Sequence, residues 1–338
     1  MHSLGLTPSW QLDEGDPLHG HLAEIVLPRV GVKVTDPHFE VGCLSNSQAV
    51  YLYQEHHSHS LLVCKFFGSR RQLSEEQRRD VLNHEWTNLS MTREKGFCTR
   101  PHRVVRPLSK DEDIDYVLVE DFARGHDLDY YIARAAHGGL HKQLFRKLTE
   151  LAHFLANLHN RTTGTAPVDF AEASSFFQSL VDSLAADGLI DAGAVSRLRS
   201  LRDAWVSADE MWADVSVLVH GDATPTNFIF HPEDGVTAID LERMRPADRM
   251  YDVSALAAEL KHHFAWRIVQ ADAAEPFIRH FLRAYCEYFP NPDSIFDLVA
   301  RRNQFYMALG ELRIACNVWL PWEHRKWLTD EACRCLQF

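Results

Sequence analysis

The chain has 338 residues, which is enough for two compact units and too many for one small hydrophobic core. With 46% hydrophobic and 24% charged residues, its composition is that of an ordinary globular protein. The formal net charge of −12 argues against a duplex nucleic-acid binder, because such surfaces are usually basic. It is compatible with a cationic small substrate.

Cysteine usage and the absence of apolar runs indicate the compartment. The seven cysteines are scattered and include no CxxC pair, so neither a disulfide framework nor a zinc site is indicated. The first twenty residues contain no Lys or Arg and no long apolar run, which predicts no secretory signal. No apolar stretch approaches the roughly 20 residues that a membrane helix needs. We therefore expect a cytoplasmic protein with no membrane or nucleic-acid partner; the oligomeric state stays open.

The N-terminal part is predicted to be rich in strands. Residues 1–20 contain many Gly, Pro and Asp residues and are expected to form a loosely ordered leader. The segment HFEVGCLSNSQAVYLYQ (38–54) is typical of two strands joined by a turn. LLVCKFF (61–67) and DYVLVED (115–121) are typical of short buried strands.

Helices dominate the remainder. Ser74 and Gln77 have the spacing of a capping box, which predicts a helix ending near Lys95. Further helices are expected at 141–160, 171–185, 193–210, 253–270, 273–288 and 295–318. This order predicts an α+β, two-lobed protein: a leader over 1–20, an N-lobe over 21–121 and a helical C-lobe over 122–338.

A hairpin with polar ends interrupts the helical part. FIF (228–230) and VTAI (236–239) are apolar runs joined by HPEDG, which contains an Asp–Gly turn signal. Folding about the middle of this turn brings Asn227 and Asp240 side by side at the open end of the hairpin. Asp222 lies in the loop that leads into the same end.

These three side chains have a chemistry in common. Oxygen donors on a rigid hairpin suit a hard divalent cation such as Mg²⁺. Phosphoryl transfer needs a metal on the phosphate oxygens and an aspartate that accepts the proton of the incoming hydroxyl. For any one of these residues a structural role is favoured, with Asp222 and Asn227 as turn formers and Asp240 as a loop cap. The complete spacing favours the functional interpretation.

The motif resembles that of a known family. HGDATPTN (220–227) followed by AIDLE (238–242) is similar to the catalytic segment of the aminoglycoside phosphotransferase and choline kinase family, small-molecule kinases with a protein-kinase-like fold. The resemblance implies that Asp222 is the catalytic base and that His220 supports its loop. It also implies that Asn227 and Asp240 bind the metal, with Glu242 a candidate on the substrate side.

A lysine and a glutamate in the N-terminal part agree with a kinase. Lys65 lies within an apolar strand, and Glu85 lies on the apolar stripe of the following helix. A lone charge is costly at either position, and pairing the two resolves both problems. The alternatives are a lysine that extends to solvent at the sheet edge and a glutamate at a half-exposed boundary.

Two further segments are candidate nucleotide contacts. The turn between the first two strands is poor in glycine, so small polar residues with their backbone amides are expected to cover the phosphates: Ser45, Asn46 and Ser47. By the same resemblance, LVEDFARGHDL (118–128) corresponds to the interlobe hinge. Its adenine contacts are expected at Asp121, Phe122 and Ala123.

The acceptor side is the least defined. Asp252 matches a position that the family uses to brace the catalytic loop, and it is equally a helix N-cap. Three residues of the C-terminal helices are candidate walls of the acceptor pocket: Glu259, Trp266 and Glu311.

The sequence thus predicts a kinase that transfers the γ-phosphate of ATP, or of GTP, to a hydroxyl group of a small molecule with the help of Mg²⁺. The alternative is a nucleotide-binding pseudokinase with an interaction or regulatory role. A protein kinase is disfavoured because no activation segment follows Asp240. The identity of the acceptor does not follow from the fold.

Overall fold

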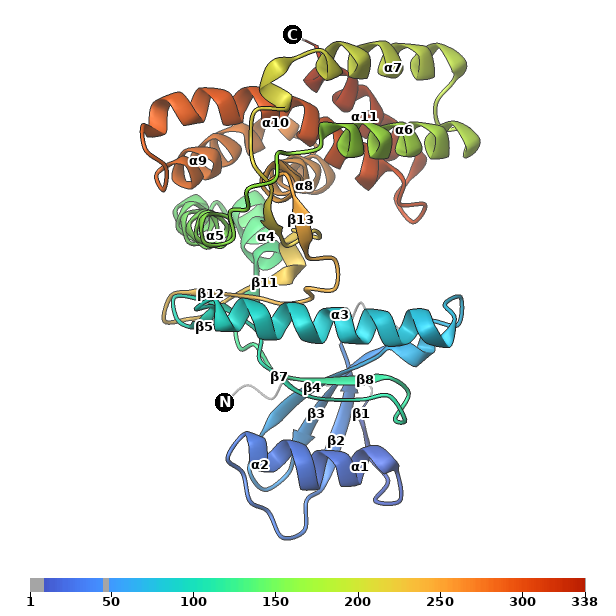
Figure 1. The fold of residues 1–338 in the computed structure, drawn as a ribbon, viewed down its shortest axis with the longest axis vertical. Helices are drawn as coiled ribbons and strands as arrows, with labels where there is room; N and C mark the ends of the chain where they lie inside the picture. The colour runs from blue at the N-terminus through green and yellow to red at the C-terminus, as the bar shows by residue number, and fades with distance from the viewer. Residues whose placement is uncertain (1–8, 45–48, 338) are drawn as a thin grey trace. The chain divides into compact units, whose positions relative to one another are not determined.

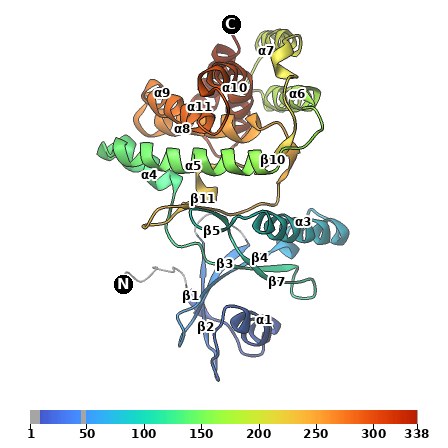
Figure 2. The same cartoon turned by 60° about the vertical axis from the view of Figure 1, so that its left-hand side comes forward.

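A computed structural model describes residues 9–44 and 49–337. The chain divides into two compact units, shown in Figures 1 and 2. Unit 1 comprises residues 1–124 and 237–242, and unit 2 comprises residues 125–236 and 243–338. The sequence prediction assigned 237–242 to the C-lobe. This segment instead joins unit 1, where the Val105 N–H donates to the carbonyl oxygen of Ala238 at 2.9 Å.

Unit 1 is built on a six-stranded sheet in the order β1-β2-β3-β4-β8-β7. All neighbouring strands pair antiparallel. The strands are β1 (Ser9–Gln11), β2 (Phe39–Cys43), β3 (Val50–Glu55), β4 (Leu61–Phe66), β7 (Pro107–Asp111) and β8 (Val117–Asp121). A smaller hairpin is formed by β5 (Cys98–Thr99) and β6 (His102–Val104).

Helices lie on both faces of this sheet (Figure 1). On one face, α1 (Pro17–His21), the π-helical turn η1 (Leu22–Val26) and α2 (Leu27–Arg29) share a core with Leu62 and Cys64 of β4. Side chains alternate along a strand, so Lys65 points to the opposite face. That face carries α3 (Glu75–Glu94), whose N-terminus has the predicted capping box between Ser74 and Gln77.

The N-terminal segment is more ordered than predicted. Ser9–Gln11 forms β1 and pairs with β2, and Trp10 contacts Tyr51 edge to face at 5.8 Å. Asp16 then caps α1 by accepting a hydrogen bond from the Leu18 N–H. The expectation of a loose leader therefore does not hold for residues 9–20, because strand pairing and a helix cap fix them. Residues 1–8 lie outside the described part of the chain.

Unit 2 is mainly helical. The predicted helical segments correspond to α5 (His141–Arg161), α6 (Phe170–Ala186), α7 (Ala192–Val206), α8 (Met250–Ile268), α9 (Glu275–Cys286) and α10 (Pro292–Ala315). Two helices were not predicted, α4 (Leu128–Gly138) and α11 (Trp322–Cys335). Short 3₁₀ turns are η2 (Phe67–Ser69) in unit 1 and η3 (Asp209–Met211), η4 (Pro225–Asn227) and η5 (Ala271–Ala274) in unit 2.

Short strands position the segment that is predicted to be catalytic. In unit 2, β10 (Val217–Val219) pairs with β13 (Arg245–Ala247), and β9 (His126–Asp127) pairs with β11 (Phe228–Phe230). The predicted turn follows β11, where the His231 N–H donates to the carbonyl oxygen of Gly235 at 3.0 Å, and β12 (Val236–Ala238) follows it.

Among the described helices, none combines the length and the apolarity that crossing a bilayer requires.

Candidate active site

Lys65 in unit 1 is surrounded by three carboxylates. Its ammonium lies 2.5 Å from Glu85 Oε1, 3.4 Å from Asp240 Oδ1 and 3.6 Å from Glu120 Oε2. Glu85 is fully buried on α3, and Glu120 is buried on β8. The structure therefore contains the predicted Lys65–Glu85 contact and brings Asp240 to the same lysine.

These groups perturb one another. Burial alone lowers the pKa of Lys65, but Glu120, Glu85 and Asp240 together hold this pKa well above its usual range. Burial raises the pKa of Glu85, and Lys65 opposes that rise. Glu85 Oε2 and Glu120 Oε1 are buried without a hydrogen-bond partner in the described structure. One ammonium is thus too little positive charge for these carboxylates.

A second cation fits beside Lys65. Oxygen atoms of Glu85, Asp240 and Glu242 lie within 4.8 Å of one another, and Arg70 contacts Glu242 at 2.6 Å. Burial raises the pKa of both Glu85 and Glu120, so a further cation beside these carboxylates would favour their charged forms. Carboxylate oxygens are the donors that Mg²⁺ prefers. Glu242, predicted on the substrate side, lies instead beside the candidate metal ligands.

The loop over His220–Asp222, which is predicted to be catalytic, needs glycine at position 221. Gly221 has φ +80°, and a Cβ at this position would lie 2.1 Å from the carbonyl oxygen of Arg243. The close approach of these two backbone segments fixes the turn between His220 and Asp222. His220 is buried against Phe228 at a ring distance of 5.1 Å, and its Nδ1 lies 3.4 Å from the Asp222 N–H. This placement agrees with a supporting role for His220.

Asp252, at the start of α8, binds the backbone of this loop through its carboxylate. Its carboxylate accepts hydrogen bonds from the backbone N–H groups of His220 at 2.6 Å and Gly221 at 3.0 Å. His159 Nε2 lies 3.1 Å away. Burial alone would raise the pKa of Asp252, but the contacts to His159 and His220 outweigh it and lower this pKa. Asp252 is fully buried, so it positions the loop and is not a substrate contact.

Asp222 is one end of a charged network. Arg313 of α10 contacts Asp222 Oδ1 at 3.0 Å and Glu259 Oε1 of α8 at 3.0 Å. Burial raises the pKa of Glu259 to about 7, although Arg313 opposes the rise. His263 lies 3.7 Å from Glu259. Arg313 contacts Oδ1, so Oδ2 is the Asp222 oxygen that this ion pair does not use.

Asn227 is oriented by the same loop. Its side-chain Nδ2 donates to the carbonyl oxygen of Asp222 at 2.9 Å. This hydrogen bond identifies the other side-chain atom as Oδ1, which can act as a metal ligand. Asp240 belongs to unit 1 and has φ +63°. The predicted adjacency of Asn227 and Asp240 joins residues of different units and stays a prediction, as do the ligand roles.

The other predicted residues have mixed outcomes. Asp121, Phe122 and Ala123 are half-buried and follow one another at the end of β8. Glu311 is fully buried, and burial raises its pKa to about 8, so it is a core residue and not a pocket wall. Trp266 is 45% exposed and contacts His324 at a ring distance of 5.0 Å. Three predicted phosphate contacts lie outside the described residues: Ser45, Asn46 and Ser47.

Several site residues were not predicted. Glu120 carried a usable signal, because a second acid in an apolar strand implies a nearby cation. Arg313, His159 and Arg70 carried none, since each lies far from its partner in sequence and occurs in a segment without a motif.

The fold and these residues define the class of protein: an α+β protein with the fold of the protein-kinase-like small-molecule kinases. Similar solved structures include an ethanolamine kinase from Plasmodium vivax, with 13% identity, coverage of 89% of this chain and 81% of that chain, and a TM-score of 0.58. The GDP complex of aminoglycoside 2'-phosphotransferase-IIIa has 15% identity, coverage of 93% and 98%, and a TM-score of 0.57. Choline kinase LicA from Streptococcus pneumoniae has 16% identity, coverage of 87% and 91%, and a TM-score of 0.52.

The family follows from the sequence itself. The model of the phosphotransferase enzyme family matches residues 93–295, which is more than half of the chain. This protein therefore belongs to the phosphotransferase enzyme family. No curated protein sequence matches it significantly.

Proposed function

We propose that the protein is a small-molecule kinase that transfers the γ-phosphate of ATP or GTP to a hydroxyl group. The observation that carries this proposal is the position of Lys65, which Glu85 holds 3.4 Å from Asp240. A lysine fixed by a buried glutamate beside a metal-binding aspartate suits binding of nucleotide phosphates. The similar aminoglycoside phosphotransferases, one of them in complex with GDP, support the use of a nucleotide.

Asp240 and Asn227 would hold Mg²⁺, with Glu242 as a neighbouring carboxylate. When bound, the ion neutralises the charge that develops on the transferred phosphoryl group. The grouping of Glu85, Asp240 and Glu242 and the unpartnered buried oxygens of Glu85 and Glu120 support this assignment.

The residues of unit 2 would act on the acceptor. Asp222 Oδ2 would accept the proton of the incoming hydroxyl and orient its oxygen toward the phosphorus. Arg313 fixes the carboxylate from its other oxygen, and Asp252 fixes the backbone on which Asp222 stands. Glu259 lies on the same network, so it is the predicted acceptor residue whose position best supports that role.

The test is an Asp222→Asn variant. We expect nucleotide binding, measured by calorimetry, to stay within about twofold of wild type while phosphoryl transfer falls at least about a thousandfold. The matched control is Asp191→Asn, which changes an exposed helix cap of the same unit that accepts from the Ala194 N–H. Wild-type turnover in the Asp222→Asn variant would remove Asp222 from the chemistry.

A further inference from the structure

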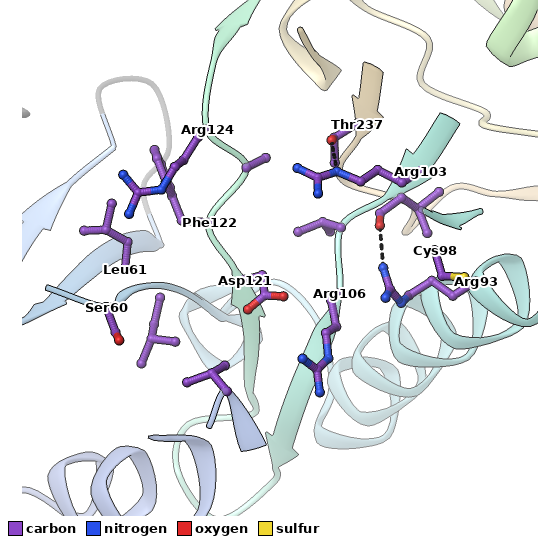
Figure 3. A pocket seen from close by; sticks show the side chains of 15 residues that line it. Ser60, Leu61, Arg93, Cys98, Arg103, Arg106, Asp121, Phe122, Arg124 and Thr237 are labelled. Atoms are coloured by element: carbon purple, nitrogen blue, oxygen red, sulfur yellow. Dashed lines mark hydrogen bonds between the residues drawn. The ribbon is translucent and has the colours of Figure 1, made fainter. Parts of the chain in front are cut away.

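A cavity in unit 1 is lined by an unusual number of arginines (Figure 3). Its volume is about 400 Å³, within the range of small-molecule sites. Four guanidinium groups and one carboxylate line it: Arg93, Arg103, Arg106, Arg124 and Asp121. This local charge of +3 contrasts with the net charge of −12 of the whole chain.

Part of the cavity wall lies on the face of the sheet opposite the Lys65 cluster. Its wall includes Leu62, which shares the core of α1 and η1, and Val30, which packs against the same core. Asp121 pairs with Leu62 in the sheet register, so its side chain points to that face as well. The side chains of Lys65 on β4 and Glu120 on β8 point to the opposite face from those of Leu62 and Asp121. Neither Lys65 nor Glu120 lines the cavity, so the nucleotide phosphates that Lys65 would bind have a separate site.

The hydrogen bonds of Arg93 and Arg106 do not neutralise these two side chains. Arg93 donates to the carbonyl oxygen of Val104 at 2.9 Å, and Arg106 donates to that of Arg29 at 3.2 Å. Arg103 donates to the hydroxyl oxygen of Thr237 at 2.6 Å. Over residues 9–44 and 49–337, neither Arg93 nor Arg106 forms an ion pair with a carboxylate. For Arg93 and Arg106, neutral carbonyl acceptors fix the directions of the guanidinium groups and supply no countercharge.

Burial and mutual repulsion lower the pKa values of two of these arginines. Burial lowers the pKa of Arg93, and the neighbouring Arg106 lowers it further. Burial likewise lowers the pKa of Arg103, and Arg93 contributes to the shift. Asp121 is the single acid among these groups, and burial raises its pKa against their attraction. An anion that enters the cavity would relieve the repulsion among the arginines.

We propose that this cavity binds a compact polyanion that carries phosphate or carboxylate groups. Planar guanidinium groups bind both kinds of oxyanion through paired N–H···O bonds. The pre-set orientation of Arg93, Arg103 and Arg106 lowers the ordering cost of such binding. Since Asp121 to Arg124 leave the sheet along the cavity wall, the ligand would lie against the segment that connects β8 to unit 2.

Cys98 provides a local reporter for the test, because it lines the cavity and is an exposed free thiol. Alkylation of Cys98 by the neutral reagent iodoacetamide would be followed on the full chain by peptide mass spectrometry. We expect pyrophosphate to slow this reaction about fivefold at about four times its Kd, relative to sodium chloride of equal ionic strength. A parallel arm with citrate distinguishes phosphate from carboxylate ligands.

Variants decide whether the arginines cause the protection. The protection of Cys98 should be lost in the double variant Arg93→Gln/Arg106→Gln. It should be kept in Arg79→Gln, which changes an exposed arginine of α3, the helix that also carries Arg93; Arg79 pairs with Glu112. If the double variant lacks a cooperative thermal transition, Arg106→Gln alone is used. Protection that sodium chloride reproduces, or that survives the arginine substitutions, would overturn the proposal. Loss of protection in Lys65→Met would also overturn it, by assigning the anion to the nucleotide phosphate site.

Discussion

Asp252, whose carboxylate braces the loop over His220–Asp222, gives the sharpest prediction about stability. Asp252→Asn preserves shape but replaces one carboxylate oxygen by an NH₂ group. Oδ2 accepts from the His220 N–H and Oδ1 from the Gly221 N–H, so one backbone donor must then face another donor. Losing one charge-assisted hydrogen bond costs about 1.5–3 kcal/mol, and the buried unpaired N–H adds about 1–3 kcal/mol. We expect the free energy of unfolding to fall by about 2.5–6 kcal/mol in total.

The assay is urea unfolding followed by circular dichroism at neutral pH. Asp191→Asn is the control, since asparagine caps a helix about as well as aspartate and the cost should stay within about 0.5 kcal/mol. The folded-state pKa of Asp252 lies below the unfolded value of 3.8. Its stabilisation is therefore complete above pH 3.8 and is lost as the pH falls through the folded pKa, so the difference between the proteins must shrink in acid. Equal costs for the two substitutions would refute this account of the brace.

Three further substitutions test other parts of the site. Lys65→Met should weaken nucleotide binding at least about tenfold in calorimetry, because the carboxylates around it would then repel the phosphates; unchanged affinity would contradict this. Gly221→Ala should lower kcat at least about tenfold through the clash at 2.1 Å. Gly188→Ala, with φ +74° and an open surrounding, shares the backbone strain without the clash and should keep wild-type kcat. Arg313→Gln should lower kcat about tenfold at unchanged nucleotide affinity, because Asp222 loses its ion pair; an unchanged kcat would speak against this positioning role.

Local signals in the sequence were sufficient for much of the fold. The capping box at Ser74, the helix predicted over 141–160 and the turn before Gly235 each depend on neighbouring residues, and the structure contains all three. The fold class was predicted correctly for the same reason. The Lys65–Glu85 contact was also predictable, since each charge occupies a position where burial without a partner is costly.

Long-range packing explains what was missed. β1 is three residues long, and its sequence carries no strand pattern; its pairing with β2 fixes it. Arg313 and Asp222 are separated by 91 residues, so no spacing in the sequence connects them. Glu311 was misassigned because a glutamate on a helix does not show which face is buried, and it lies in the core near Lys261.

The central claim is that this chain transfers phosphate to a small hydroxyl compound, and phosphorus NMR tests it most directly. Wild-type protein would be incubated with Mg²⁺, ATP or GTP, and a panel of aminoglycosides, amino alcohols and sugars. The account predicts a phosphate monoester resonance that grows in step with the nucleoside diphosphate for at least one acceptor, and that requires Mg²⁺. Nucleotide that binds with Mg²⁺ while no acceptor yields a monoester would contradict it and indicate a pseudokinase instead.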